Sequence, residues 1–131
     1  MIIVDASALI AICFDEPDAE QFATALANAN ERRISAVNYL EAAIRIDRED
    51  STITSQKFEA LIKHLKIRIE PVTAEQTHLA RTAYAQYGKG VHPAALNFGD
   101  CFAYALSKHT RMPLLFKGND FSQTDIVGVF V

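Results

Sequence analysis

The sequence contains few of the residues that define several classes of protein. Its 131 residues include only two cysteines, four prolines and five glycines. A disordered or fibrous chain would be richer in proline and glycine, so both classes are excluded. Cys13 and Cys101 lie in apolar stretches, outside any CxxC pair and away from any histidine at a metal-ligand spacing. We interpret them as small buried hydrophobic residues in a reducing compartment.

Positively charged residues are also few relative to negatively charged ones. Thirteen Lys and Arg residues stand against 16 Asp and Glu residues, which gives a net charge of −3. A protein that grips nucleic acid by electrostatic attraction alone would be strongly basic, so this class is disfavoured. A nuclease is not excluded, because a metal site concentrates carboxylates and brings its own positive charge.

No apolar run reaches the roughly 18 residues of a membrane span. The apolar segment 1–14 lacks the basic start of a signal peptide and carries Asp5 in its middle. We therefore expect a cytoplasmic protein without a membrane segment. Half of the residues are hydrophobic and 22% are charged, which predicts a proper core. The length predicts a single domain over residues 1–131.

Short apolar runs alternate with helical periodicities along the chain. The predicted strands are residues 2–4, 34–37, 67–69, 114–116 and 126–129, and the predicted helices follow Asp18, include Leu40, Ala43 and Ile44, and span 58–65, 73–87 and 98–109. The terminal strands are continuous apolar runs, which is typical of a parallel sheet covered on both faces. The alternation of strands and helices predicts an α/β sandwich.

Four carboxylates are predicted to meet at the carboxyl edge of this sheet, where open parallel sheets bind their ligands. Asp5 ends the first strand, and Asp120 follows the 114–116 strand across a short turn. Glu41 is expected in the first turn of the helix after the 34–37 strand. Asp100 joins the group if the helix that carries it leans its N-terminus over the sheet.

Convergent carboxylates repel one another unless a cation lies among them. Hard oxygen ligands without His or Cys select Mg²⁺, with Mn²⁺ as a substitute. Such an ion retains water molecules, activates one of them as a nucleophile and stabilises charge on a phosphate. The carboxylate pattern therefore predicts metal-assisted hydrolysis of phosphodiester bonds.

Each carboxylate also has a simpler interpretation. Asp5 could only cap the following helix, and Glu41 could close a capping box with the asparagine three residues before it. Asp100 could complement a helix dipole, and Asp120 could be an ordinary turn residue. Four such coincidences at one edge are harder to explain than one site, so we favour the site.

Several other polar residues accompany the carboxylates. Ser7 could bond to a metal ligand or a water, or simply start a helix. Asn119 could contact phosphate or fix the neighbouring aspartate, although asparagine is common in turns. Scattered cations could steer a phosphate backbone, with solvated surface charge as the simpler interpretation of each. The cations proposed for this role are Arg45, Arg48, Lys108 and Lys117.

Four stretches of the sequence resemble the signatures of PIN-domain ribonucleases. They are VDASAL at 4–9, NYLEAA at 38–43, FGDCFAYA at 98–105 and LLFKGNDF at 114–121. Their order and spacing cover nearly the whole chain, and the last two are the most specific. The sequence is most similar to the VapC toxins of bacterial toxin–antitoxin pairs.

This resemblance implies a three-layer, PIN-like fold with a parallel sheet between helices. It implies that Asp5, Glu41, Asp100 and Asp120 form the acidic site, with Asp5 and Asp100 binding Mg²⁺ directly and the others acting through water. It further implies an RNA substrate, a homodimer and a small antitoxin that covers the site. Ala6 stands where threonine is frequent in the family, and we expect little effect from it.

Two functions of other classes are also considered. A phospho-accepting receiver-like module would need paired acidic residues after the first strand and an Asp after the third, but Asp5 stands alone and residues 67–72 carry Glu70 and no Asp. A catalytically silent PIN-like module would only bind protein, and the intact set of carboxylates argues against it. We therefore expect a metal-dependent endoribonuclease.

Overall fold

The computed structural model describes residues 1–130, which form a parallel sheet and six α-helices. The elements are β1 (Ile2–Val4), α1 (Ala6–Cys13), α2 (Ala19–Asn28), β2 (Arg32–Ser35), α3 (Ala36–Asp47), α4 (Thr52–His64), β3 (Arg68–Glu70), α5 (Ala74–Tyr87), α6 (Phe98–Thr110), β4 (Leu114–Leu115) and the 3₁₀-helix η1 (Phe121–Gln123). None of the helices described is both long and apolar enough to cross a membrane.

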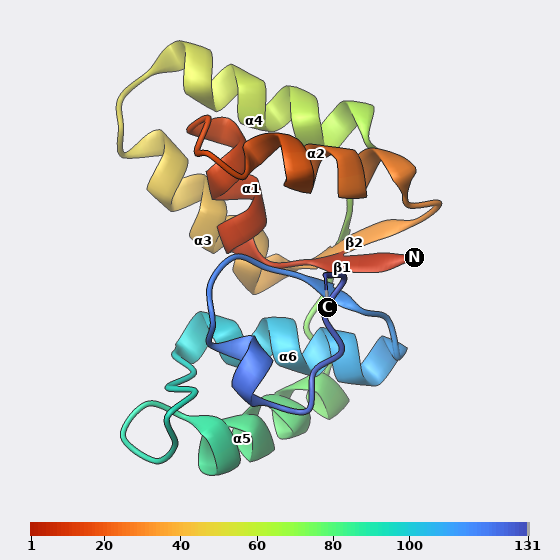
Figure 1. The fold of residues 1–131 in the computed structure, drawn as a ribbon, viewed down its shortest axis with the longest axis vertical. Coiled ribbons are helices and arrows are strands. Elements are labelled where there is room, and N and C mark those ends of the chain that lie inside the picture. The colour runs from red at the N-terminus through yellow and green to blue at the C-terminus, as the bar shows by residue number, and fades with distance from the viewer. Residues whose placement is uncertain (131) are drawn as a thin grey trace.

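The sheet has the strand order β3-β2-β1-β4, and all its pairings are parallel. Helices α1 to α4 cover one face, and α5 and α6 cover the other (Figure 1). Successive side chains of a strand point to opposite faces. Ile2 and Val4 accordingly pack into the core beneath α1–α4, whereas Ile3 packs into the core against α6. The predicted α/β fold, a parallel sheet between two helical layers, is confirmed.

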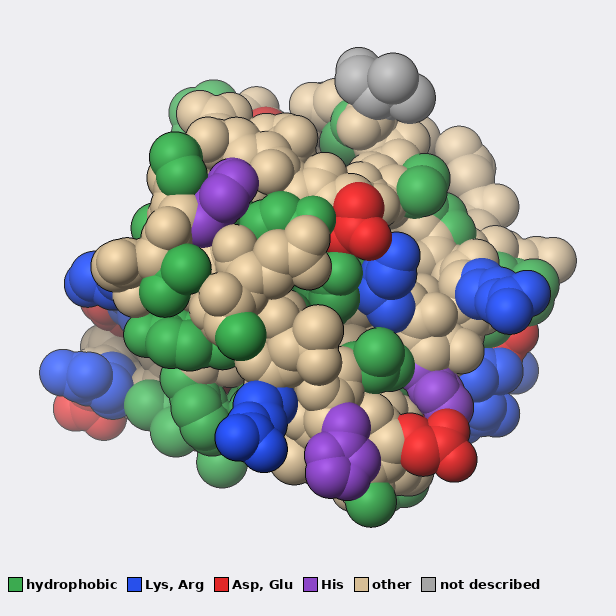
Figure 2. Space-filling model, turned by 90° about the horizontal axis from the view of Figure 1, so that it is seen from below, with side chains coloured by type: hydrophobic (Ala, Val, Ile, Leu, Met, Phe, Trp, Pro, Cys, Tyr) green, Lys and Arg blue, Asp and Glu red, His purple; other side chains and the backbone are tan. Residues whose placement is uncertain are grey.

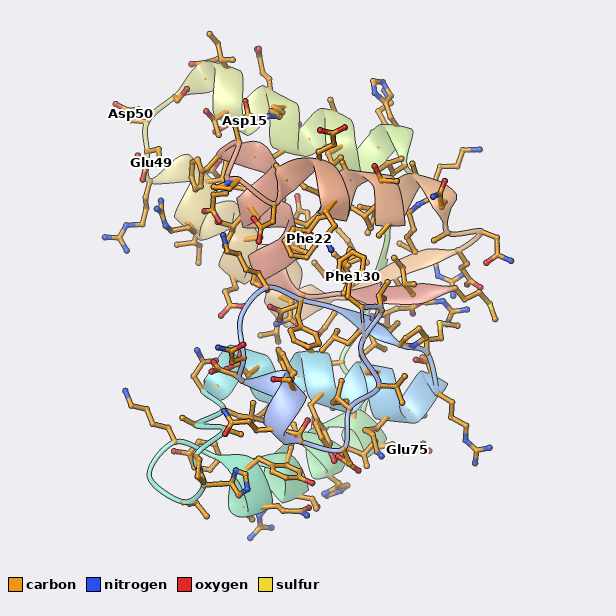
Figure 3. The ribbon with its side chains drawn as sticks, in the orientation of Figure 1. Asp15, Phe22, Glu49, Asp50, Glu75 and Phe130 are labelled. Atoms are coloured by element: carbon orange, nitrogen blue, oxygen red, sulfur yellow. The ribbon has the colours of Figure 1, made fainter. Side chains whose placement is uncertain are left out.

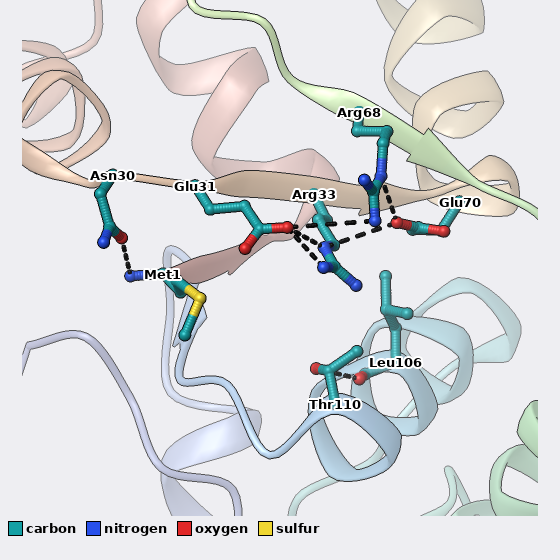
Figure 4. A network of polar contacts seen from close by, with 8 residues as sticks. All are labelled: Met1, Asn30, Glu31, Arg33, Arg68, Glu70, Leu106 and Thr110. Atoms are coloured by element: carbon teal, nitrogen blue, oxygen red, sulfur yellow. Dashed lines mark hydrogen bonds and ion pairs between the residues drawn. The ribbon is translucent and has the colours of Figure 1, made fainter.

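Polar contacts join the neighbouring strands β2 and β3. Glu31, just before β2, pairs with Arg33, which also contacts Glu70 of β3 at 3.5 Å (Figure 4).

Near the other end of the chain, the ring of Phe130 lies 5.9 Å from that of Phe22 on α2 (Figure 3). The last described residues are therefore packed against the α2 layer of the sandwich.

Two sequence predictions about the elements are wrong. Residues 126–129 do not form a strand, because only a single bridge joins Gly128 to Leu114 and Val127 is 70% exposed. The strand predicted at 34–37 ends at Ser35, whose hydroxyl accepts from the Val37 N–H at 3.3 Å and caps α3. Helix α3 thus begins earlier than predicted, and Glu41 lies in its second turn.

Two of the apolar residues that indicate α3 in the sequence are not on its buried face. Leu40 and Ile44 are 56% and 49% exposed, whereas Asn38, Ala42 and Ile46 are fully buried. The buried face therefore includes an amide at a position where an apolar residue would be expected.

Arg32 of β2 joins three elements through its guanidinium group. It donates to the carbonyls of Leu26, Ala27 and Ala29 at the end of α2, and to that of Leu65 after α4 at 2.7 Å. A lysine ammonium cannot serve all these acceptors, and each half-buried carbonyl that loses its donor forfeits a hydrogen bond worth about 0.5–1.5 kcal/mol. We expect Arg32→Lys to lower the free energy of unfolding by about that amount in urea titrations. Arg45→Lys, at an exposed site, is the control and should change it by less than about 0.5 kcal/mol.

Candidate active site

Asp5 follows β1 directly and is held at the carboxyl edge of the sheet. Its N–H donates to the Leu115 carbonyl of β4 at 2.9 Å. Its Oδ2 accepts from both the N–H and the hydroxyl of Ser7, at 3.1 and 2.5 Å, and so caps α1. The side chain is buried, and its Oδ1 has no hydrogen-bond partner among residues 1–130.

Ser7 also connects α1 to the turn after β4. Its Oγ accepts from the Lys117 N–H at 2.9 Å. The turn continues through Gly118, whose φ of +103° favours glycine, to the exposed Asp120 at the start of η1. Asn119 offers its backbone carbonyl to the Ser122 hydroxyl at 2.7 Å, and in the described part of the chain its side chain makes no hydrogen bond.

Asp100 lies in the first turn of α6 and is part of a true capping box. Its Oδ2 accepts from the Asn97 N–H at 3.0 Å, and its own N–H donates to Asn97 Oδ1 at 2.9 Å. The sequence suggested only that this residue complements the helix dipole; the structure shows that a capping interpretation holds as well, although capping occupies only one carboxylate oxygen. The corresponding interpretation of Glu41 is wrong, because Ser35 is the cap of α3.

Glu41 reaches the N-terminus of α6 from α3. The amide of Asn38, one turn earlier, donates to Glu41 Oε1 at 3.3 Å and to the Gly99 carbonyl at 2.9 Å. Gly99 permits this approach, because a Cβ added there would overlap the Glu41 carboxylate. The side chains of α3 and the first turn of α6 therefore meet directly.

The four carboxylates form one cluster, in which each lies close enough to at least one other for their charges to interact. Burial raises the pKa of Asp5 to about 6, and repulsion from Glu41 adds to the shift. Burial likewise raises the pKa of Asp100 to about 6, with contributions from Asp5 and Asp120. The pKa of Glu41 is raised by burial and by Asp100. The structure thus brings together the four carboxylates predicted from the sequence.

The cluster fits a hard divalent cation. Across residues 1–130, no three Asp, Glu, His or Cys side chains are grouped so that they could hold a metal ion together. Mg²⁺ does not need such a group, because it is usually held by one or two carboxylates and retains several waters. The unpaired Oδ1 of Asp5 offers a buried ligand, and the surrounding donors are oxygens. These features suit Mg²⁺ or Mn²⁺.

The four predicted phosphate-binding cations do not form one patch. The Lys117 backbone contacts Ser7, but its ammonium pairs with Glu16 and Asp18 at 2.5 and 3.2 Å. Lys108 is two turns beyond Asp100 along α6, about 12 Å away, and pairs with Asp125 at 2.7 Å.

The other two cations lie along α3. Arg45, one turn after Glu41, pairs with Glu49 at 2.5 Å and lies 4.7 Å from the Phe14 ring centre. Arg48 is exposed just after the helix. On the face formed by α5 and α6, Lys and Arg side chains are likewise dispersed rather than gathered (Figure 2).

Sequence reasoning missed two residues of this site. Asn38 was considered only as a capping partner, and Gly99 was not singled out. A glycine inside a helix costs about 1 kcal/mol relative to alanine, so its presence in the first turn of a predicted helix indicates a close approach by another group. The partner could not have been identified from that signal, because Asn38 and Gly99 are 61 positions apart in the sequence.

Comparisons with known proteins agree with this architecture. A model of the PIN domain matches residues 2–127. Ribonuclease VapC28 of Mycobacterium tuberculosis is 52% identical over 125 residues, which cover 95% of this chain and 94% of that protein. Ribonuclease VapC of Mycolicibacterium smegmatis is 43% identical over 127 residues, which cover 97% of this chain and 98% of that protein.

Solved structures show the same fold at low sequence identity. The crystal structure of Mycobacterium tuberculosis VapC20, described as a Sarcin-Ricin loop cleaving toxin, superposes with a TM-score of 0.79, is 18% identical and covers 98% of each chain. A toxin–antitoxin complex from Klebsiella pneumoniae contains a chain with a TM-score of 0.73 and 15% identity, covering 95% of this chain and 93% of that one.

Replacing Asp100 by Asn is expected to stabilise the protein in metal-free buffer at neutral pH. Asn keeps an oxygen for the Asn97 N–H but removes a charge that Asp5 and Asp120 repel. Because the folded-state pKa of Asp100 is raised from 3.8 to about 6, its ionisation costs the wild type stability as the pH rises through this window. The variant loses less stability there, because only Asp5, of the two aspartates with a pKa of about 6, still ionises. We expect a gain of about 1 kcal/mol at neutral pH after solvent screening, and none well below pH 4.

Urea unfolding in EDTA at both pH values measures this difference. A variant less stable than the wild type at neutral pH would mean that the carboxylate serves only to cap α6, where its charge favours the helix dipole.

Gly99→Ala is expected to destabilise the protein through Glu41. The added methyl group overlaps the Glu41 carboxylate, the far end of a flexible side chain that can shift away, so the cost in unfolding free energy should be below about 1 kcal/mol. In a Glu41→Ala background the same change should be neutral or stabilising by up to about 1 kcal/mol, because alanine favours the helix. Urea unfolding of the wild type, both single variants and the double variant gives the coupling. An equal cost in both backgrounds would contradict the contact.

Proposed function

The chain belongs to the PIN domain family, and from this premise we propose that it is an endoribonuclease acting as the toxin of a toxin–antitoxin pair. The observation that carries the proposal is the cluster of coupled carboxylates at the carboxyl edge of the sheet. The names of its relatives, which are VapC ribonucleases, support RNA as the substrate. We propose that it acts in the cytoplasm.

Asp5 and Asp100 are the proposed direct ligands of Mg²⁺, with Mn²⁺ as a substitute, and Glu41 and Asp120 act through water. When bound, the ion supplies an activated water and stabilises charge on the scissile phosphate. Ser7 fixes the Asp5 carboxylate and leaves its Oδ1 free. Glu41, whose pKa is raised by burial, is a stronger base than an exposed glutamate and is therefore suited to accept a proton from the attacking water.

The RNA backbone is proposed to contact the dispersed cations. Lys117 is the best placed of them, because its backbone is bonded to Ser7 and the adjacent turn leads to Asp120. Arg45 and Arg48 extend from the end of α3 that follows Glu41. Lys108 is more remote, and its role requires the substrate to run along α6. RNA binding to Lys117 and Lys108 would replace their present carboxylate partners.

Two protein partners are proposed. A cognate antitoxin would present an Arg or Lys side chain to the carboxylates, since charge-assisted pairs of this kind are strong. A second copy of the chain would cover exposed apolar side chains near the site. Leu40 and Ile44 of α3 and Phe98 of α6 support this homodimer, because Phe98 is 73% exposed beside the Gly99 that contacts Glu41.

Asp5→Asn is the test of the proposed activity. The variant should fold, because an amide oxygen can still accept from Ser7, but it weakens the hold on a divalent cation. We expect the rate of RNA cleavage in Mg²⁺ to fall at least about a hundredfold. Losses of this size are usual when one key polar group is removed from an active site. The control is Asp50→Asn, in an exposed turn whose φ of +55° suits asparagine. Undiminished cleavage by the Asp5 variant, or by the wild type in EDTA, would contradict the proposed metal-dependent chemistry, whereas a folded wild type that cleaves no RNA in Mg²⁺ would favour a catalytically silent PIN-like module.

A further inference from the structure

We propose that Asn38 is a positioning residue that holds Glu41 beside Asp100 by joining α3 to the first turn of α6. The inference rests on the proposed metal-dependent cleavage. The Asn38 side-chain amide donates to two partners that are distant from each other in the sequence. They are the Glu41 carboxylate at 3.3 Å and the Gly99 carbonyl at 2.9 Å. Asp100 is the next residue after Gly99, so the two carboxylates are set by the same amide.

The orientation of the Asn38 amide is determined by its surroundings. Both near partners are acceptors, so the NH₂ group must face them. The other end, Oδ1, is buried and has no hydrogen-bond partner within residues 1–130, and the residue as a whole is 0% exposed. The amide therefore cannot flip without losing both contacts.

This arrangement is poor for stability alone. A buried acceptor without a partner costs about 1–3 kcal/mol, and an apolar residue of similar size at the same position would avoid that cost. The rest of the buried face of α3 is apolar, with Ala42 and Ile46. What the amide provides, and an apolar residue would not, is a donor that reaches both Glu41 and α6.

Gly99 is the second residue on which the contact between α3 and α6 depends. Its missing side chain lets the Glu41 carboxylate lie against the α6 backbone, while its carbonyl receives the Asn38 amide. Glu41 is thereby limited on one side by Gly99 and on the other by Asn38. Precise placement of charged groups in an active site matters, because errors of about 1 Å can cost a hundredfold in rate.

Asn38→Leu tests the proposal, because leucine fills a similar volume and makes neither hydrogen bond. We expect the variant to fold, to bind Mg²⁺ about 10- to 100-fold more weakly by calorimetry, and to lower kcat for RNA cleavage with little change in KM. Asn38→Ser, with a smaller side chain, provides a second folded variant and should show losses of the same kind.

Ser107→Ala is the matched control. Ser107 is also a buried polar residue, and its hydroxyl donates to the Met112 carbonyl at 2.6 Å near the opposite end of α6. This variant should lose stability while keeping the Mg²⁺ affinity and kcat of the wild type. An Asn38→Leu protein that likewise loses only stability would reduce Asn38 to a structural residue and overturn the proposal.

A double-mutant cycle with Glu41→Ala identifies the route of action. If Asn38 acts through Glu41, adding Asn38→Leu to the Glu41 variant should change Mg²⁺ affinity less than about twofold. Fully additive losses would overturn that route.

Failure of the proposed function has a different signature. A wild-type protein that neither binds Mg²⁺ nor cleaves RNA contradicts the function, and the positioning role is then decided by amide hydrogen exchange. Asn38→Leu should speed exchange in the first turn of α6, and Ser107→Ala should not; equal exchange in the two variants would overturn the link between α3 and α6.

Discussion

Mutual repulsion among clustered carboxylates is the constraint on which the rest of this structure depends. Burial is the main cause that raises the pKa values of Asp5, Glu41 and Asp100, and the neighbouring charges add to it. Folding must therefore assemble a group that the unfolded chain keeps apart. A rigid scaffold with cores on both faces of the sheet offsets that cost, and a cation at the site would relieve it.

The hydrogen bonds around the cluster show how the scaffold fixes each charge. Ser7 donates to Asp5, and Asn38 donates to Glu41. The Asn97 N–H donates to Asp100. Each of these donors stabilises the ionised carboxylate and lowers its pKa, while burial acts in the opposite sense. The site therefore retains partly compensated negative charge rather than a set of neutral acids.

Sequence reasoning found the parts of the site that depend on strand ends and missed those that depend on contacts between helices. Asp5 could be placed because parallel strands share a carboxyl edge. Leu40 and Ile44 indicate a helix in the sequence but are exposed in the structure, whereas the polar Asn38 is buried and donates to the Gly99 carbonyl of α6. The final strand was overpredicted because residues 126–129 are apolar, although a single bridge to β4 is all that forms.

Cations were the least predictable feature for a related reason. Lys108 and Lys117 are close in sequence to the site, but their side chains pair with carboxylates outside it. Long flexible side chains choose among nearby charges only after the fold is formed, so spacing along the chain carries little information about their direction.

Capping and metal binding need not be competing interpretations of Asp5 and Asp100. Each residue lies at the N-terminal end of a helix, α1 or α6, and each gives one carboxylate oxygen to that helix. The N-terminal ends of these two helices carry partial positive charge. This charge favours the ionised form of each carboxylate, which repulsion and burial oppose. The two helices converge at the same edge of the sheet, so a single arrangement orients the ligands, moderates their repulsion and leaves their remaining oxygens for a cation. Helix capping, which explains each aspartate separately, is thus also the interaction that allows the two aspartates to be assembled into one site.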